Sequence, residues 1–150
     1  MKNLIIRTVT GAIFVALVVL SFFMNPLFFD VLFLSFSFIA TWEYLQMVAK
    51  TDATPQIILP LVLTALLFST FQLMQYSIYA SLIILLVTLV LILGVPIVEL
   101  FRKRSQPLHN VALSLFPLVW ITLPIGIIGM WTHFFEAYSV VLALFVIIWA

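Results

Sequence analysis

Long uncharged stretches alternate with short charged clusters along the chain, and this pattern predicts its architecture. No Lys, Arg, Asp or Glu occurs in the intervals 8–29, 31–42, 53–98, 105–135 and 137–150. A bilayer core about 30 Å thick is crossed by about 20 helical residues, each rising about 1.5 Å. The interval 53–98 is about twice that length, so we expect it to turn back on itself. The polar cluster at 72–77 is the natural place for that turn.

We therefore expect about six transmembrane helices. Their predicted ranges are about 8–24, 30–49, 57–74, 78–101, 109–131 and 135–150. Helices are expected because open strands cannot pair their backbone groups in lipid, and the chain lacks the alternating segments of a membrane barrel. The predicted fold class is all-α: a polytopic integral membrane protein with no internal repeat and no soluble second domain.

The amino-acid composition excludes several classes of protein. The chain is 66% hydrophobic and 7% charged, with a mean hydropathy of +1.36, whereas soluble domains are about 45–50% apolar and about 25% charged. This composition excludes a soluble enzyme and a nucleic-acid-binding protein. Because the chain contains no cysteine, disulfides, Cys-ligated zinc, iron–sulfur clusters and cysteine nucleophiles are excluded as well.

The charges fall unevenly on the two sides of the predicted helices. All the basic residues fall on one side: Lys2, Arg7, Lys50, Arg102, Lys103 and Arg104. The opposite side receives Asp30 and Glu136. Because cytoplasmic loops of membrane proteins carry an excess of Lys and Arg, we predict a cytoplasmic N-terminus.

The last predicted helix is short. From Glu136 to Ala150 it would rise only about 21 Å, and a chain that ended there would leave its carboxylate inside the bilayer, where a charge is unfavourable by a few kcal/mol. We therefore expect the polypeptide to continue past position 150. A tilted or shallow last helix is the alternative.

The residues alone predict no reaction centre. The sequence has no Gly-rich phosphate loop, no Gly-x-Ser-x-Gly elbow and no His-Glu-x-x-His motif. His109 and His133 lie at opposite ends of one predicted helix, about 36 Å apart, and cannot share a metal ion. Since the carboxylates do not pair in sequence either, we predict no catalytic residue and no metal ligand in this chain.

The basic triplet Arg102, Lys103 and Arg104 is a candidate lipid-binding site. It directly follows a predicted transmembrane helix. Such clusters attract anionic headgroups, and their side chains can hold a lipid phosphate through charge-assisted hydrogen bonds. Alternatively, the triplet only orients the chain and pairs with Glu99, three and four residues earlier.

Glu43 is a second candidate for contact with a lipid headgroup. It precedes Lys50 by seven residues, so it would lie about 10 Å below the cytoplasmic surface. Acidic residues inside membranes often mark functional sites. Alternatively, Glu43 reaches headgroup water from an interfacial belt formed with Trp42 and Tyr44.

Three prolines interrupt predicted helices. Pro96, Pro117 and Pro124 each remove a backbone hydrogen bond and bend a helix. Together with Gly126 and Gly129, the last two predict a bent helix that neighbouring helices approach closely.

Several stretches resemble one family of membrane enzymes. They are Arg7-Thr8-Val9-Thr10-Gly11, Trp42-Glu43, the segment 110–115 with Leu123-Pro124 beyond it, and the apolar segment 140–150 ending in Trp-Ala. In order and spacing they resemble the N-terminal membrane part of bacterial phosphatidate cytidylyltransferases (CDP-diacylglycerol synthases). The resemblance covers essentially the whole chain. The family's Asp-x-Gly-Ala-Tyr segment and its later signature are absent from this sequence, so no catalytic residue is carried over.

The resemblance implies transfer of a cytidylyl group from CTP to phosphatidate with Mg²⁺, giving CDP-diacylglycerol and diphosphate for phospholipid biosynthesis. The partners that it implies are a membrane lipid, phosphatidate, and CTP, in a bacterial inner membrane; a homodimer is compatible with it. Residues 1–150 are then the N-terminal transmembrane region of a longer enzyme and are expected to be inactive alone. A transporter fragment, for which Glu43 and the broken helices are suitable, and a small structural membrane subunit are the alternatives.

Overall fold

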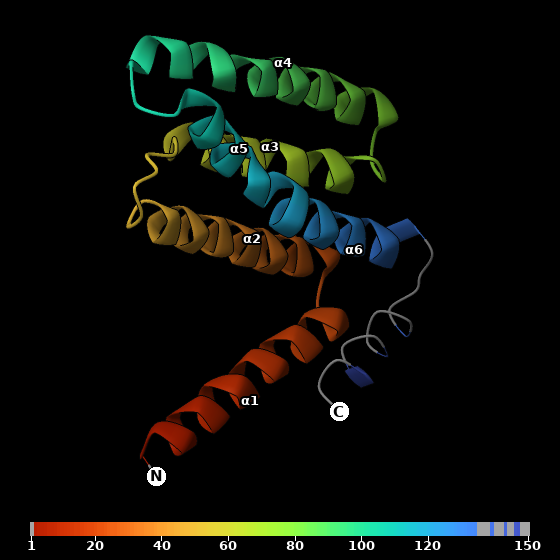
Figure 1. Ribbon diagram of the computed structural model, residues 1–150. Coiled ribbons are helices and arrows are strands. Elements are labelled where there is room, and N and C mark those ends of the chain that lie inside the picture. Colours follow the sequence, from red (N-terminus) through yellow and green to blue (C-terminus); the bar gives the residue numbers. More distant parts are fainter. Residues whose placement is uncertain (1, 135–138, 140–142, 144–145, 148–150) are drawn as a thin grey trace.

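The computed structural model describes residues 2–134, 139, 143 and 146–147, and the described part is helical (Figure 1). Its elements are α1 (Lys2–Phe23), α2 (Pro26–Val48), α3 (Ile58–Leu73), α4 (Ile78–Arg102), α5 (Pro107–Pro117), the short π-helix η1 (Leu118–Thr122) and α6 (Leu123–Phe134). The predicted all-α fold class is confirmed for these residues. The last predicted helix, 135–150, and Glu136 lie outside the continuous described part.

α3 is the central helix of the bundle. It packs against α2 on one side and α4 on the other, and it also contacts α6. The segment formed by α5, η1 and α6 crosses these three helices, whereas α1 packs on α2 and is set at an angle to the rest (Figure 1). The loops that join α2 to α3 and α4 to α5 lie at the same end of the bundle (Figure 1).

Local capping explains where two helices begin. The Asn25 side chain accepts a hydrogen bond from the Leu27 backbone N–H at 3.1 Å, and Pro26 occupies the first turn, a position that suits proline. α2 therefore begins before the predicted start at Asp30, because the cap and not the charge sets the boundary. α3 ends at Leu73 and α4 begins after the Ser77 cap, so the turn predicted at 72–77 is confirmed.

The helix lengths give fewer full spans than the sequence predicts. Among the described residues, three helical segments are long and apolar enough to cross a bilayer: Pro26–Val48, Ile78–Arg102 and Pro107–Trp131. Two shorter apolar helical segments, Thr8–Ser21 and Ile58–Leu73, accompany them. α1 begins at Lys2, earlier than the predicted residue 8, because its helix continues through the charged N-terminal residues.

The predicted helix 109–131 is divided. α5 ends at Pro117, and the wider turn of η1 follows, closed by a hydrogen bond from the Leu123 N–H to the Leu118 carbonyl. Pro124 has no N–H to continue the regular pattern, which explains why the irregular turn lies directly before it. The bend predicted from Pro117 and Pro124 therefore takes the form of a π-helix.

α6 approaches α3 closely at two glycines, as predicted. A Cβ atom at Gly126 would lie 2.5 Å from Cδ2 of Phe71, and one at Gly129 would collide with the Gln72 amide. At Gly94 of α4, by contrast, a Cβ atom would meet nothing within 4 Å. Small residues thus permit the contact between α3 and α6, as is common between membrane helices.

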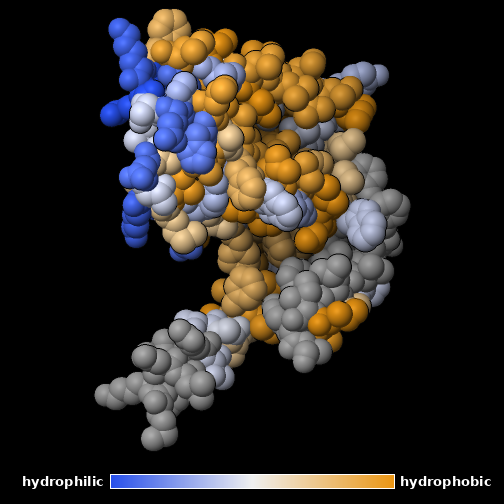
Figure 2. Space-filling model, in the orientation of Figure 1, coloured by the Kyte–Doolittle hydropathy of each residue, from blue (hydrophilic) through white to orange (hydrophobic). Residues whose placement is uncertain are grey.

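The interior of the bundle combines apolar clusters with buried hydroxyl groups. Phe29, Phe33 and Phe68 form one apolar cluster with Val18. Between α2, α3 and η1, the Thr64 hydroxyl accepts a hydrogen bond from Thr122 at 3.2 Å and lies 3.3 Å from the Thr41 hydroxyl oxygen. The visible outer surface is mostly apolar, and hydrophilic residues gather at one end of the bundle (Figure 2). This distribution is expected for a protein whose surroundings are lipid.

Candidate functional site

The hydrophilic end of the bundle is held together by contacts between its two loops. Arg102, the last residue of α4, donates a hydrogen bond from Nη1 to the backbone oxygen of Thr54 at 3.0 Å. This bond joins the connection after α2, which also carries Lys50, to the basic triplet after α4. These cations therefore lie at the same end of the bundle.

A buried carboxylate organises this end. Glu99 is only 1% exposed, although it carries a charge. Its Oε2 accepts hydrogen bonds from Arg102 Nη1 at 2.7 Å and from Gln56 Nε2 at 3.1 Å, and its Oε1 accepts one from Asn110 Nδ2 at 2.9 Å. A charge removed from water is stable in a protein only when it is paired and hydrogen-bonded in this way.

The same contacts fix the connection between α2 and α3. The Thr54 N–H donates to Asn110 Oδ1 at 2.9 Å, and the Gln56 N–H donates to the Ser114 hydroxyl at 2.8 Å. Asn110 and Ser114 lie one turn apart on α5, so one face of this helix binds two residues of the loop on either side of Pro55. We call this set the Glu99 network; its members are Thr54, Gln56, Glu99, Arg102, Asn110 and Ser114.

The Arg102 guanidinium is held at one nitrogen and open at the others. Nη1 uses its hydrogens on Glu99 and the Thr54 carbonyl. Among the described residues, no hydrogen bond is made by Nε or Nη2, and the side chain is 28% exposed. Because guanidinium is planar and rigid, the anchored group keeps its remaining N–H donors in a fixed direction.

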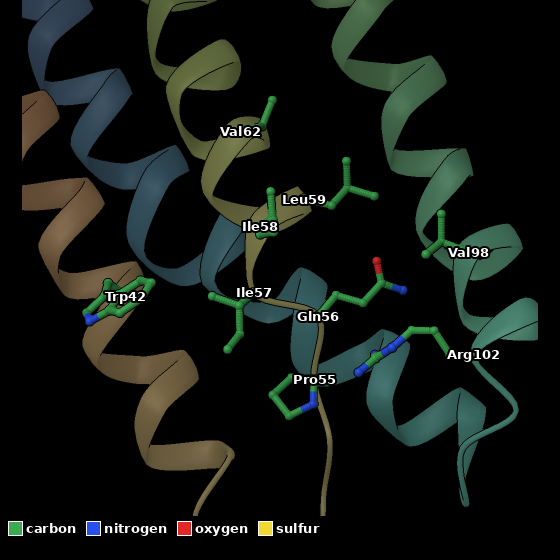
Figure 3. A pocket seen from close by; sticks show the side chains of 9 residues that line it. All are labelled: Trp42, Pro55, Gln56, Ile57, Ile58, Leu59, Val62, Val98 and Arg102. Atoms are coloured by element: carbon green, nitrogen blue, oxygen red, sulfur yellow. The ribbon is translucent and has the colours of Figure 1, made fainter.

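Arg102 lines a cavity of about 640 Å³ between α2, α3 and α4 (Figure 3). The other lining residues are Trp42, Pro55, Gln56, Ile57, Ile58, Leu59, Val62 and Val98. The walls are almost entirely apolar, and the cation and the Gln56 amide lie together at the end formed by the loop and α4 (Figure 3). Such a cavity suits an amphipathic ligand with an anionic head.

The structure separates the residues that the sequence singled out. Arg102 lines the cavity, whereas Lys103 and Arg104 are exposed beside it, with Lys103 ending α4 at φ 50°. The expected pair between Glu99 and Arg102 is present. Within the described part of the chain, no ion pair joins Glu99 to Lys103.

Glu43 lies in a different place. It is exposed on α2 and lines a separate cleft of about 390 Å³, whose other walls come from α1, α2 and α6. Its neighbour Trp42 lines the cavity of Arg102 instead. Glu43 and Arg102 therefore line different hollows.

Sequence reasoning missed Gln56 and Asn110, and it treated Glu99 only as a partner of the basic triplet. A signal was present, since Glu99 is the only acidic residue in the apolar stretch from 53 to 101. A carboxylate in such a stretch needs polar partners from elsewhere in the chain. Asn110 and Ser114, spaced by four, were the available donors and acceptors on the following helix.

The described residues do not fit the magnesium ion that the resemblance implies. Among them, no three His, Asp or Glu side chains lie together as metal ligands. Magnesium is held by carboxylates and substrate phosphates, and in this part of the chain Glu99 is already committed to Arg102, Gln56 and Asn110.

Comparison with known proteins identifies the family. No curated protein and no solved structure matches the chain. The sequence model of the cytidylyltransferase family matches residues 5–150, which is nearly the whole sequence. The chain therefore belongs to the cytidylyltransferase family of membrane enzymes, as its resemblance to CDP-diacylglycerol synthases predicts.

Proposed function

We propose that residues 1–150 are the N-terminal membrane region of an enzyme that transfers the cytidylyl group of CTP to phosphatidate. In this reaction a phosphate oxygen of the lipid bonds to the α-phosphorus of CTP, the α–β bridging bond breaks, and diphosphate leaves. Family membership and the apolar helices support this proposal. The observation that carries it furthest is the anchored Arg102 guanidinium at one end of an apolar cavity.

In this proposal the chain binds and positions the lipid. The free N–H donors of Arg102 bind the phosphate monoester, while Lys103 and Arg104 attract anionic lipid by about 1 kcal/mol each. The apolar walls receive the hydrophobic part of the molecule. The hydrophilic end of the bundle then faces the bacterial cytoplasm, and the three long apolar helical segments cross the inner membrane.

We leave Glu43 out of the proposed headgroup site. It lines the separate cleft between α1, α2 and α6, and a carboxylate would repel a phosphate. In this proposal the part of the chain that the structure describes holds the lipid phosphate in place and supplies no group of magnesium ligands.

We predict that Arg102→Gln lowers the affinity of the chain for phosphatidate about tenfold, because loss of charge-assisted hydrogen bonds to a phosphate removes about 1.4 kcal/mol or more. The measurement is phosphatidate binding by the purified chain in bilayer discs, with thermal unfolding recorded in parallel. Lys50→Gln, which removes an exposed cation at the same end, is the matched control for general attraction of anionic lipid and should weaken binding less, by at most about 1 kcal/mol. Arg102→Lys should be intermediate, because an ammonium group cannot reproduce the guanidinium fork. Equal losses in Arg102→Gln and Lys50→Gln would refute the proposed headgroup site.

We further predict that the purified chain 1–150 forms no CDP-diacylglycerol from CTP and phosphatidate, because its sequence lacks the family's Asp-x-Gly-Ala-Tyr segment. The natural gene product that contains these residues should form it with CTP as the required co-substrate. The measurement is release of diphosphate together with detection of the lipid product. Product formation by the chain alone would contradict the first expectation, and an inactive gene product would contradict the proposed reaction.

A further inference from the structure

The cavity beside Arg102 continues along the bundle as a second hollow. This hollow measures about 390 Å³ and shares Trp42, Ile57, Ile58 and Val62 with the first cavity. It adds four further side chains: Phe38, Leu61, Ala65 and Leu66. Because the two hollows share these walls, they lie side by side along α2 and α3, and we call the pair the α2–α3 groove.

The polarity of the lining residues changes along the groove. Arg102 and Gln56 line only the first hollow, and the second is lined only by apolar side chains and the Trp42 indole. From Ile57 to Leu66 it follows α3 for nine residues, or about 13 Å, which is enough for roughly the first ten carbons of an acyl chain. One polar end and one apolar arm match the shape of a membrane lipid.

The groove is open to the surrounding lipid and rests on fixed walls. Ile58 is 79% exposed, and Trp42 and Val62 are each 44% exposed, so a molecule can enter from the side of the bundle. The loop that closes the polar end is held by the hydrogen bonds of Gln56 to Ser114, Val95 and Glu99. Binding to a preformed groove orders fewer protein groups than binding to a flexible surface does, so less conformational entropy is lost.

We propose that the α2–α3 groove binds one acyl chain of an anionic phosphate lipid whose headgroup contacts Arg102. The choice of occupant follows from charge complementarity, because the cation lies at the end where the headgroup of such a lipid would lie. For the identity of the headgroup, the inference rests on the proposed function. The groove further makes α3 a determinant of acyl-chain preference, which the cytidylyl transfer itself does not require.

Ala65 is the smallest side chain in the hollow farther from Arg102, where Phe38, Leu61 and Leu66 line the same space. A larger side chain at this position would fill the volume that the distal part of an acyl chain occupies. Ala65→Leu should fill it partly and Ala65→Phe more completely.

The test is photolabelling of the chain in bilayer discs by a phosphatidate analogue that carries a diazirine near the tenth carbon of one acyl chain. We expect the label on residues 61–66 of α3 and on α2 near Phe38 and Trp42. Ala65→Phe should lower labelling at these positions about fivefold, or about 1 kcal/mol, and Ala65→Leu should lower it less. Ala112→Phe, at an exposed position on α5, is the matched control and should leave the label unchanged. Thermal unfolding of each variant distinguishes loss of the groove from loss of the fold.

Two outcomes separate the groove from the headgroup proposal. A label spread evenly over the exposed face of α4, or one unaffected by both substitutions of Ala65, would overturn the groove. A phosphatidylcholine analogue with the same acyl chain should label the groove more weakly than phosphatidate. Equal labelling by both lipids would refute selection of an anionic headgroup by Arg102 and leave the acyl groove in place.

Discussion

Glu99→Ala is expected to lower the free energy of unfolding of the chain by about 3–5 kcal/mol, the effect of breaking a buried ion pair by removal of one partner. The substitution leaves Arg102 without its counter-charge and removes one acceptor each from the Asn110 and Gln56 amides, which keep Ser105 and Val95 carbonyls as partners. A hydrogen bond to a charged group contributes about 1.5–3 kcal/mol, and these contributions overlap within one network. The measurement is reversible unfolding of the purified chain in detergent micelles.

Two further variants separate the causes of this loss. Glu99→Gln preserves the shape of the side chain but places an amide N–H₂ group among other donors. We therefore expect a free energy of unfolding between those of wild type and Glu99→Ala. Glu43→Gln removes an exposed carboxylate from α2 and should change stability by no more than about 0.5 kcal/mol. Equal effects of Glu99→Ala and Glu43→Gln would show that the Glu99 network does not stabilise the fold.

Glu99→Gln links the stability of the fold to lipid binding. Glu99 and the Thr54 carbonyl hold Nη1 of Arg102, and Gln56 lines the cavity that this arginine faces. Loss of the carboxylate leaves the charged guanidinium without its ion pair and held by the Thr54 carbonyl. In the proposed function, Glu99→Gln therefore weakens phosphatidate binding, although removal of a negative charge would by itself favour an anionic lipid. Glu99 acts here as a positioning residue for Arg102.

Much of the fold follows from local signals in the sequence. The polar residues at 72–77 interrupt an apolar stretch that is too long for one span, and α3 and α4 meet there. Gly126 and Gly129 recur at a spacing that places them on one face, and that face contacts α3. These features depend on residues close together in the chain, where hydrophobic length and small side chains leave few alternatives.

The candidate site depends on contacts that local patterns do not determine. Gln56 and Glu99 are 43 residues apart, and Thr54 and Asn110 are 56 apart. Their pairing follows from the arrangement of α3, α4 and α5, which the sequence pattern leaves open. For the same reason the sequence did not distinguish Trp42, which lines the Arg102 cavity, from Glu43, which faces another cleft. Adjacent residues on a helix point about 100° apart, so a motif of two residues need not belong to one site.

Gly126→Ala is expected to lower the free energy of unfolding by about 1–3 kcal/mol, the range for overpacking a close contact. The added methyl group would lie 2.5 Å from Cδ2 and 3.1 Å from Cε2 of Phe71. An aromatic ring in a packed interface cannot yield as a flexible side chain can, so α6 must move away from α3. The measurement is again unfolding of the purified chain in micelles, compared with wild type.

Gly94→Ala provides the matched control, because the same methyl group on α4 meets nothing within 4 Å. Alanine is a better helix former than glycine by about 1 kcal/mol in helix interiors, so this variant should be as stable as wild type or more stable. The contrast between the two variants isolates the packing of α6 on α3 from the general effect of replacing glycine in a helix. If both substitutions stabilised the chain, the two helices would not be in the close contact that holds η1 and α6 against the central helix.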